Sequence, residues 1–72
     1  MKVSNLVTKI IAGMPIIIER VEASGYSEKL LRVPYLMLNG KYMVPDVLME
    51  MEVSVISHHE EDETIYLLIT VE

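Results

Sequence analysis

The sequence predicts an α+β domain in which a short N-terminal helix packs on a small, mainly antiparallel sheet of about four to six strands. The prediction depends on an amphipathic stripe at the start, an Asn-Gly pair in the middle and two strand-like runs at the end. Successive hairpins of this kind can also curve into a barrel-like arrangement. No linker, internal repeat or low-complexity segment interrupts residues 1–72, so a single domain is expected.

The first predicted element is a helix over residues 4–12. Its apolar positions follow the i, i+3, i+4, i+7, i+8 spacing that places side chains on one helical stripe. Ser4 can cap the start of this helix, and Gly13 followed by Pro15 can end it. The stripe consists of Val3, Leu6, Val7, Ile10 and Ile11.

Two strands are predicted after this helix. The β-branched run over residues 16–22 ends at an Ala-Ser-Gly segment, which is typical of a strand followed by a turn. Residues 29–33 form a second strand, and Pro34 limits its pairing to an edge or an end of the sheet. The two strands can form a hairpin across residues 23–28.

A second hairpin is predicted at Asn39-Gly40. This pair between apolar runs favours a type I′ turn, which needs a positive φ at both central residues. A short helical turn is expected over residues 46–50, directly after Pro45. The predicted hairpin pairs Leu38 with Lys41 and Leu36 with Met43.

The clearest strand pattern lies at the C-terminal end. Residues 52–58 and 64–71 are predicted strands, joined by a loop over residues 59–63. A register with His58 opposite Thr64 gives one face that is almost wholly apolar and is therefore the predicted core side. On that side Ser57 pairs with Ile65, Val55 with Leu67, Val53 with Ile69 and Met51 with Val71.

The opposite face of this strand pair carries a candidate contact surface. In the same register Ile56 lies opposite Tyr66, and Ser54 lies opposite Leu68. Ile56, Tyr66 and Leu68 then form an apolar island on a face that is otherwise polar, which is typical of a surface that meets a partner. The alternative is that the N-terminal helix or the middle hairpin covers this island.

Charge is distributed unevenly along the chain. All six Lys and Arg residues lie within residues 1–41 beside three acids, whereas residues 42–72 contain eight acids and no Lys or Arg. The formal charge is therefore +3 in the first part and −8 in the second. A net charge of −5 with scattered cations disfavours direct binding to nucleic acid. The longest apolar stretch, residues 10–18, is too short to span a membrane, so a soluble cytoplasmic protein is expected.

Size and composition favour self-association. A domain this short buries only about 60% of the surface that its unfolded chain exposes. The absence of cysteine excludes disulfides and zinc–thiolate sites. Yet 51% of the residues are hydrophobic, and association with a second copy is the simplest way to cover them.

The run from His58 to Glu63 is the candidate metal site. All six side chains are potential ligands, but neighbours on a strand point to opposite faces, and the run matches no calcium-loop or zinc-helix motif. A solvated hairpin tip explains the run without a metal. Its acids could also imitate the charge of nucleic acid in the basic groove of a host protein. These acids are Glu60, Glu61, Asp62 and Glu63.

No catalytic constellation is visible in the sequence. The chain contains neither a nucleophile elbow nor a glycine-rich phosphate loop, and no His is placed to activate a Ser or Thr. Neither an enzymatic activity nor a cofactor is therefore expected.

Several segments resemble small orphan proteins of phages and prophages of Gram-positive bacteria. The resemblance lies in the opening helix 1–7, the strand 16–19, and the segment 44–49 that leads into residues 52–56. Such proteins typically contain a helix, a strand pair, a Pro-containing turn and a terminal strand pair. The resemblance implies an origin in a mobile element, and it assigns no role to any residue.

Three functions are consistent with these observations. The first is a non-enzymatic interaction protein that forms a homodimer through a sheet edge or through the apolar island, and that also meets a host or phage protein. The second is an acidic inhibitor of a host protein that acts on nucleic acid. The third is a metal-binding module that uses residues 58–63.

Overall fold

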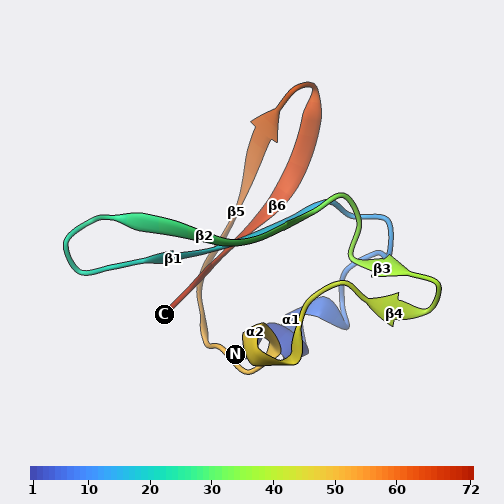
Figure 1. Cartoon of the computed structure of the whole chain (residues 1–72), viewed down its shortest axis with the longest axis horizontal. Helices are drawn as coiled ribbons and strands as arrows, with labels where there is room; N and C mark the ends of the chain where they lie inside the picture. Colours follow the sequence, from blue (N-terminus) through green and yellow to red (C-terminus); the bar gives the residue numbers. More distant parts are fainter.

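The computed structural model describes residues 1–72 and contains two short helices and six strands (Figure 1). The α+β class is confirmed. In chain order the elements are α1 (Val3–Val7), β1 (Ile16–Val21), β2 (Ser27–Val33), β3 (Met37–Leu38), β4 (Lys41–Tyr42), α2 (Asp46–Met49), β5 (Val53–Glu61) and β6 (Thr64–Val71).

Four of the strands form one sheet in the order β2-β1-β6-β5, and β3 pairs only with β4. The β1–β2 and β5–β6 pairs are antiparallel, as expected, but β1 and β6 at the centre run parallel. This parallel pairing joins Ile16 to Leu67, and no local pattern indicates a contact between residues so far apart in the chain. The sheet is therefore mixed. It is also open, so the barrel-like alternative is wrong.

The N-terminal helix is shorter than the predicted 4–12 and begins one residue earlier. Lys2 rather than Ser4 occupies the N-cap position, and its backbone N–H donates to Oδ1 of Asn5 (3.1 Å). The helix ends at its C-cap residue Thr8, whose Oγ1 donates to the backbone carbonyl of Asn5 (2.9 Å). Such local side-chain bonds compete with a continuing helix.

The residues after α1 turn toward the middle hairpin instead of continuing the helix. The amide of Met37 in β3 donates to the carbonyl of Ala12 (3.0 Å), which joins this turn to the hairpin. Ile11 consequently leaves the predicted apolar stripe and is 78% exposed. Ile10 remains half-buried against the core, so the stripe is correct except at its last position.

The Asn39-Gly40 hairpin is confirmed. Asn39 has a φ of 53° and Gly40 a φ of 76°, the left-handed values that a type I′ turn requires. The expected pairing follows, with Leu38 opposite Lys41. The predicted helical turn after Pro45 is also present as α2, with Pro45 at its N-cap.

The C-terminal strand pair is confirmed, but its predicted register is wrong. β5 continues to Glu61, and only Asp62 and Glu63 form the turn. His58 therefore pairs with Leu67 instead of Thr64, a shift of three positions along β6. Because the shift is odd, most side chains of β5 lie on the opposite face from the one predicted. A bulge between Val53 and Val55 then returns Val53 to the core side.

The hydrophobic core lies on one face of the sheet. The helices α1 and α2 and the β3–β4 hairpin pack there, while the tips of the β1–β2 and β5–β6 hairpins extend away from them (Figure 1). The molecule is flat, 38 × 29 × 16 Å, because only one face of the sheet is covered. The buried cluster contains Val3, Val7, Ile16, Ile18, Val33, Leu36, Val44, Leu48, Ile69 and Val71.

Candidate functional site

The face of the sheet opposite the core is the candidate functional site, and we call it the open face. Ile16 and Ile18 belong to the core cluster, so Ile17 between them points the other way. Ile17 lies opposite Arg32 of β2 on one side and Leu68 of β6 on the other. The open face is formed around Ile17, Glu19, Lys29, Arg32, His59, Glu61, Tyr66 and Leu68.

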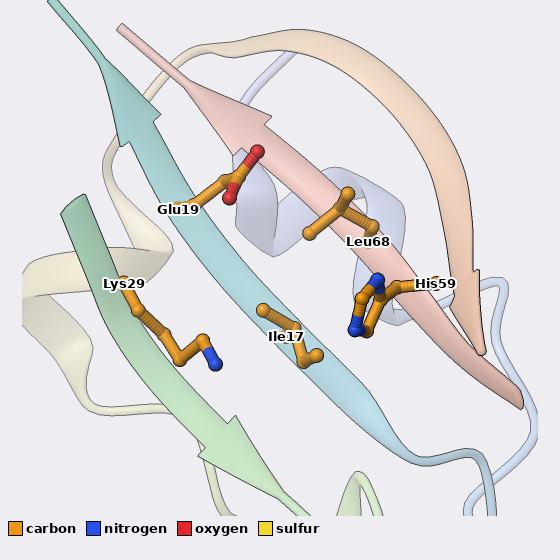
Figure 2. Close-up of a pocket in the computed structure, with 5 residues that line it drawn as sticks. All are labelled: Ile17, Glu19, Lys29, His59 and Leu68. Carbon is orange, nitrogen blue, oxygen red and sulfur yellow. The ribbon is translucent and has the colours of Figure 1, made fainter. Parts of the chain in front are cut away.

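A shallow hollow of about 200 Å³ lies on this face. Ile17 and Leu68, which are paired residues of the two central strands, form its floor. Figure 2 shows Lys29 from β2 and His59 from β5 reaching over Ile17 from opposite sides, and Glu19 further along β1. Ile17 is only 1% exposed, whereas Leu68 is partly exposed, so Leu68 supplies most of the accessible apolar surface of the floor, and the rim is polar.

A chain of polar contacts supports one side of the hollow. Arg32 donates from Nη2 to the hydroxyl of Tyr66 (2.9 Å), and its guanidinium lies 4.9 Å from the centre of that ring. Nη1 of Arg32 forms an ion pair with Glu61 (3.0 Å), and Nε2 of His59 lies 3.6 Å from the same carboxylate oxygen. The His59 ring therefore lies beside this group of contacts, at a distance that is too long for a hydrogen bond to Glu61.

The same contacts explain the electrostatics of Arg32. The hydrogen bond to Tyr66 is the largest cause that raises the pKa of Arg32, and the charge of Glu61 adds to it. These contacts favour the cationic form that a guanidinium already has near neutral pH. Its side chain is 37% exposed, which keeps the ion pair with Glu61 partly hydrated.

The predicted apolar island does not exist as one surface. Tyr66 and Leu68 do share the open face, but Ile56 pairs with Ile69 and therefore lies on the core side of the sheet. Tyr66 is 9% exposed beneath Arg32, and Ile56 is 44% exposed near the edge of the sheet. The three residues cannot meet one partner surface together.

The acidic run is divided in the same way. His59 and Glu61 point to the open face, His58 and Glu60 point to the other face, and Asp62 and Glu63 form the turn. Glu61 is bound to Arg32, so it is not a free surface charge. The structure contains no group of three or more His, Asp or Glu side chains that could hold a metal ion together.

Sequence reasoning did not identify the hollow. Its residues come from four strands, and the central contact between Ile17 and Leu68 depends on the parallel β1–β6 pairing. The charged residues of the predicted hairpin over residues 16–33 are a partial signal, although Glu19 lies opposite Lys29 only in the observed register, which a bulge after Ile18 shifts. That signal alone places two opposite charges on one face without indicating a hollow between them.

Comparisons of the chain with protein-family models, with curated proteins and with solved structures found no significant match. No helix in the structure has the length and apolar character needed to cross a membrane.

Proposed function

We propose that the protein is a non-enzymatic interaction protein that self-associates by pairing the free edge of β5 with the same strand of a second copy. The observation that carries the proposal is the position of β5 at one edge of the four-stranded sheet. An edge strand presents unpaired N–H and C=O groups, and these groups are a template for another strand. Pairing two copies would extend the sheet without changing either fold.

The available part of this edge begins at Ser54. The start of β5 is already covered, because the N–H of Val53 donates to the carbonyl of Met1 (2.8 Å) and the N–H of Val3 donates to the carbonyl of Met51 (2.9 Å). Through these bonds residues 1–3 lie beside residues 51–53 and cover that part of the strand edge. Residues 54–61 then remain free along the outer edge of β5.

β5 is better suited to pairing than β2, the strand at the other edge. β2 carries charged Glu28, Lys29 and Arg32, and Pro34 follows it, whereas a bulge is present in the pairing of both edge strands and does not distinguish them. Charges, bulges and proline are the features that protect an edge from further pairing. Residues 54–58 of β5 have no Lys, Arg, Asp, Glu or Pro, and Val55 and Ile56 are 52% and 44% exposed.

The symmetry of a dimer restricts how two such strands can pair. In an antiparallel pair around a two-fold axis, one residue must lie opposite its own copy. If that residue is Ser57, each strand uses residues 54–60, which matches the free part of the edge. Val55 and Ile56 then lie opposite His59 and His58 of the second copy. The ring of His58 would cover the exposed methyl groups of Ile56, whereas the ring of His59 is directed over Ile17 and Leu68 of its own sheet.

This register also separates the carboxylates. Glu60 lies opposite Ser54 of the second copy, and the two Glu60 side chains are six positions apart, about 20 Å. That separation exceeds the screening length of about 8 Å at physiological salt. A register centred on Glu60 would instead place like charges directly opposite each other, which is unfavourable.

The decisive test uses charges introduced at Ser57, which is exposed and contacts no residue through its side chain by hydrogen bond. For the unmodified chain we expect a concentration-dependent mass in analytical ultracentrifugation, with a dissociation constant on the order of 10 μM, because the interface is small. Ser57→Lys and Ser57→Glu each place like charges at the two-fold axis, so each variant alone should be monomeric. An equimolar mixture of the two should recover the dimer mass.

Ser27→Lys is the matched control, since Ser27 is exposed and lies at the start of β2, on the other edge. It should dimerise like the unmodified chain. A monomeric unmodified chain, dimers that tolerate Ser57→Lys, or a mixture that remains monomeric would each contradict the proposal. The recovery in the mixture excludes misfolding as the reason for the loss.

A further inference from the structure

We propose that the hollow on the open face binds a small zwitterion, of the size and charge pattern of a free amino acid with an aliphatic side chain. The inference does not rest on self-association, because it concerns the face of the sheet and not its edge. It depends on three properties of the hollow: an apolar floor, two opposite charges held apart, and a volume suited to a small ligand.

The floor offers an apolar contact that is already formed. Ile17 and Leu68 are directly paired across the parallel central strands, so their side chains lie beside each other. The ring of His59, which lies 3.6 Å from a carboxylate oxygen of Glu61, forms a wall next to them (Figure 2). A ligand side chain placed here would be covered from below and from one side without any rearrangement of the sheet.

The charges of the hollow are not used within the molecule. Glu19 and Lys29 pair directly across β1 and β2, a position in which opposite charges usually contact each other. The ion pairs of the protein nevertheless involve neither of them. Figure 2 shows the Lys29 ammonium directed toward Ile17 and the Glu19 carboxylate on the other side of the hollow. A ligand that carries both charges can bind between them.

The net charge of the protein distinguishes a zwitterion from a simple ion. The chain has a formal charge of −5, so a free anion would be repelled both by the whole molecule and by Glu19. A simple cation would meet Lys29. A zwitterion has no net charge, and its carboxylate and ammonium groups can each form a charge-assisted hydrogen bond, with Lys29 and Glu19 respectively.

The size of the hollow sets the size of the ligand. Its volume of about 200 Å³ is below the range of about 300–1,000 Å³ that is usual for drug-sized ligands. An amino acid with a branched aliphatic side chain has an appropriate number of atoms. For so small a ligand in an open hollow we expect a dissociation constant on the order of 1–10 mM.

The test is a titration of the isotope-labelled full chain with leucine, followed by two-dimensional NMR of amide and methyl groups. We expect saturable shifts centred on Ile17 and Leu68 at up to about 50 mM leucine. Leucinamide lacks the carboxylate, 4-methylpentanoate lacks the ammonium group, and glycine lacks the side chain. Each of these should bind about fivefold more weakly or worse, since each loses one of the three contacts.

Two variants assign the contacts, and one variant serves as a control. Lys29→Gln and Glu19→Gln should each weaken leucine binding by about fivefold, whereas Lys41→Gln, at an exposed position on β4, should not change it. The absence of saturable shifts at Ile17 and Leu68 would overturn the proposal. Equal binding of leucine and 4-methylpentanoate, or an equal loss in Lys41→Gln and Lys29→Gln, would overturn it as well.

Discussion

Replacing Glu63 with glycine should stabilise the protein, because the turn between β5 and β6 holds two ordinary residues in a left-handed conformation. Asp62 has a φ of 49° and Glu63 a φ of 64°. The other two-residue turn of the chain uses Asn39 and Gly40 for the same geometry, with Gly40 at the second position. Glu63 occupies the corresponding position without the conformational freedom of glycine.

The size of the effect follows from two opposing terms. A residue with a side chain pays about 1–2 kcal/mol to adopt the left-handed region. Glycine avoids this cost but loses about 0.5–1 kcal/mol more conformational entropy on folding. The net gain for Glu63→Gly is therefore about 0.5–1 kcal/mol, which corresponds to about 3–6 °C in the melting temperature of so small a domain.

Thermal and urea unfolding monitored by circular dichroism, at one fixed protein concentration, measure this gain. Glu63→Gln is the essential control, because it removes the same negative charge and keeps a side chain at the left-handed position. The reciprocal variant, Gly40→Gln, should cost the same net amount, about 0.5–1 kcal/mol, since its added Cβ meets no atom within 4 Å and only the two backbone effects remain. If Glu63→Gly unfolds no later than Glu63→Gln, strain at this turn is not a determinant of stability.

Three further predictions concern the core, the open face and the N-terminus. Ile69 is fully buried, so Ile69→Ala should cost about 2–5 kcal/mol in chemical denaturation, and a cost below ~1 kcal/mol would contradict its place in the core. Tyr66→Phe removes the hydrogen bond from Arg32 and should cost about 0.5–1 kcal/mol in the same assay, provided the near-ultraviolet spectrum confirms an intact fold. Lys2 donates to Glu50 (2.8 Å), and this bond raises the pKa of Lys2 above its usual 10.5. The bond therefore contributes stability that is present below about pH 10.5 and is lost as the pH rises through the pKa of Lys2 in the folded protein. In a plot of the free energy of unfolding against pH, Glu50→Gln should therefore reduce the decline at alkaline pH. An unchanged curve would exclude this ion pair as a source of the pH dependence.

Elements defined by a local signal could be predicted from the sequence. Asn39-Gly40 specifies its own turn through backbone conformation, and Pro45 specifies the start of α2. The strand β1 follows from its β-branched composition and from the turn residues after it, while β2 begins at Ser27, two residues earlier than predicted. In these cases the residues that indicate the element are the residues that form it, so the element can be predicted without knowledge of tertiary contacts.

The predictions that failed depended on contacts elsewhere in the fold. The turn at Asp62-Glu63 lacks glycine, so the surrounding run of acids indicated a longer loop and a register three positions away from the real one. β5 continues to Glu61 through its pairing with β6, and the Glu61 carboxylate contacts Arg32 from a distant part of the chain. The hollow required the same kind of information, since it forms only when the parallel β1–β6 pairing brings Ile17 beside Leu68.

The uneven charge of the sequence has an internal explanation in the fold. Three ion pairs each join a cation of the first part to an acid of the second, so three of the eight acids are bound within the molecule. These pairs are the N-terminal ammonium of Met1 with Glu52 (3.1 Å), Lys2 with Glu50 (2.8 Å) and Arg32 with Glu61 (3.0 Å).

Two of these pairs attach the N-terminus along the start of β5, where the backbone bonds of Met1 and Val3 cover the strand edge. These pairs are exposed and contribute little to stability, so they orient this segment more than they stabilise the fold. The acids that remain unpaired lie on α2, at the tip of the β5–β6 hairpin and at the C-terminus. Imitation of nucleic acid requires a dense, ordered array of charges, and these separate positions do not form one. The paired acids of the second half therefore help to define which part of the β5 edge is free, because they attach the N-terminus beside it. This arrangement favours a structural role for these acids and not a role as an electrostatic surface.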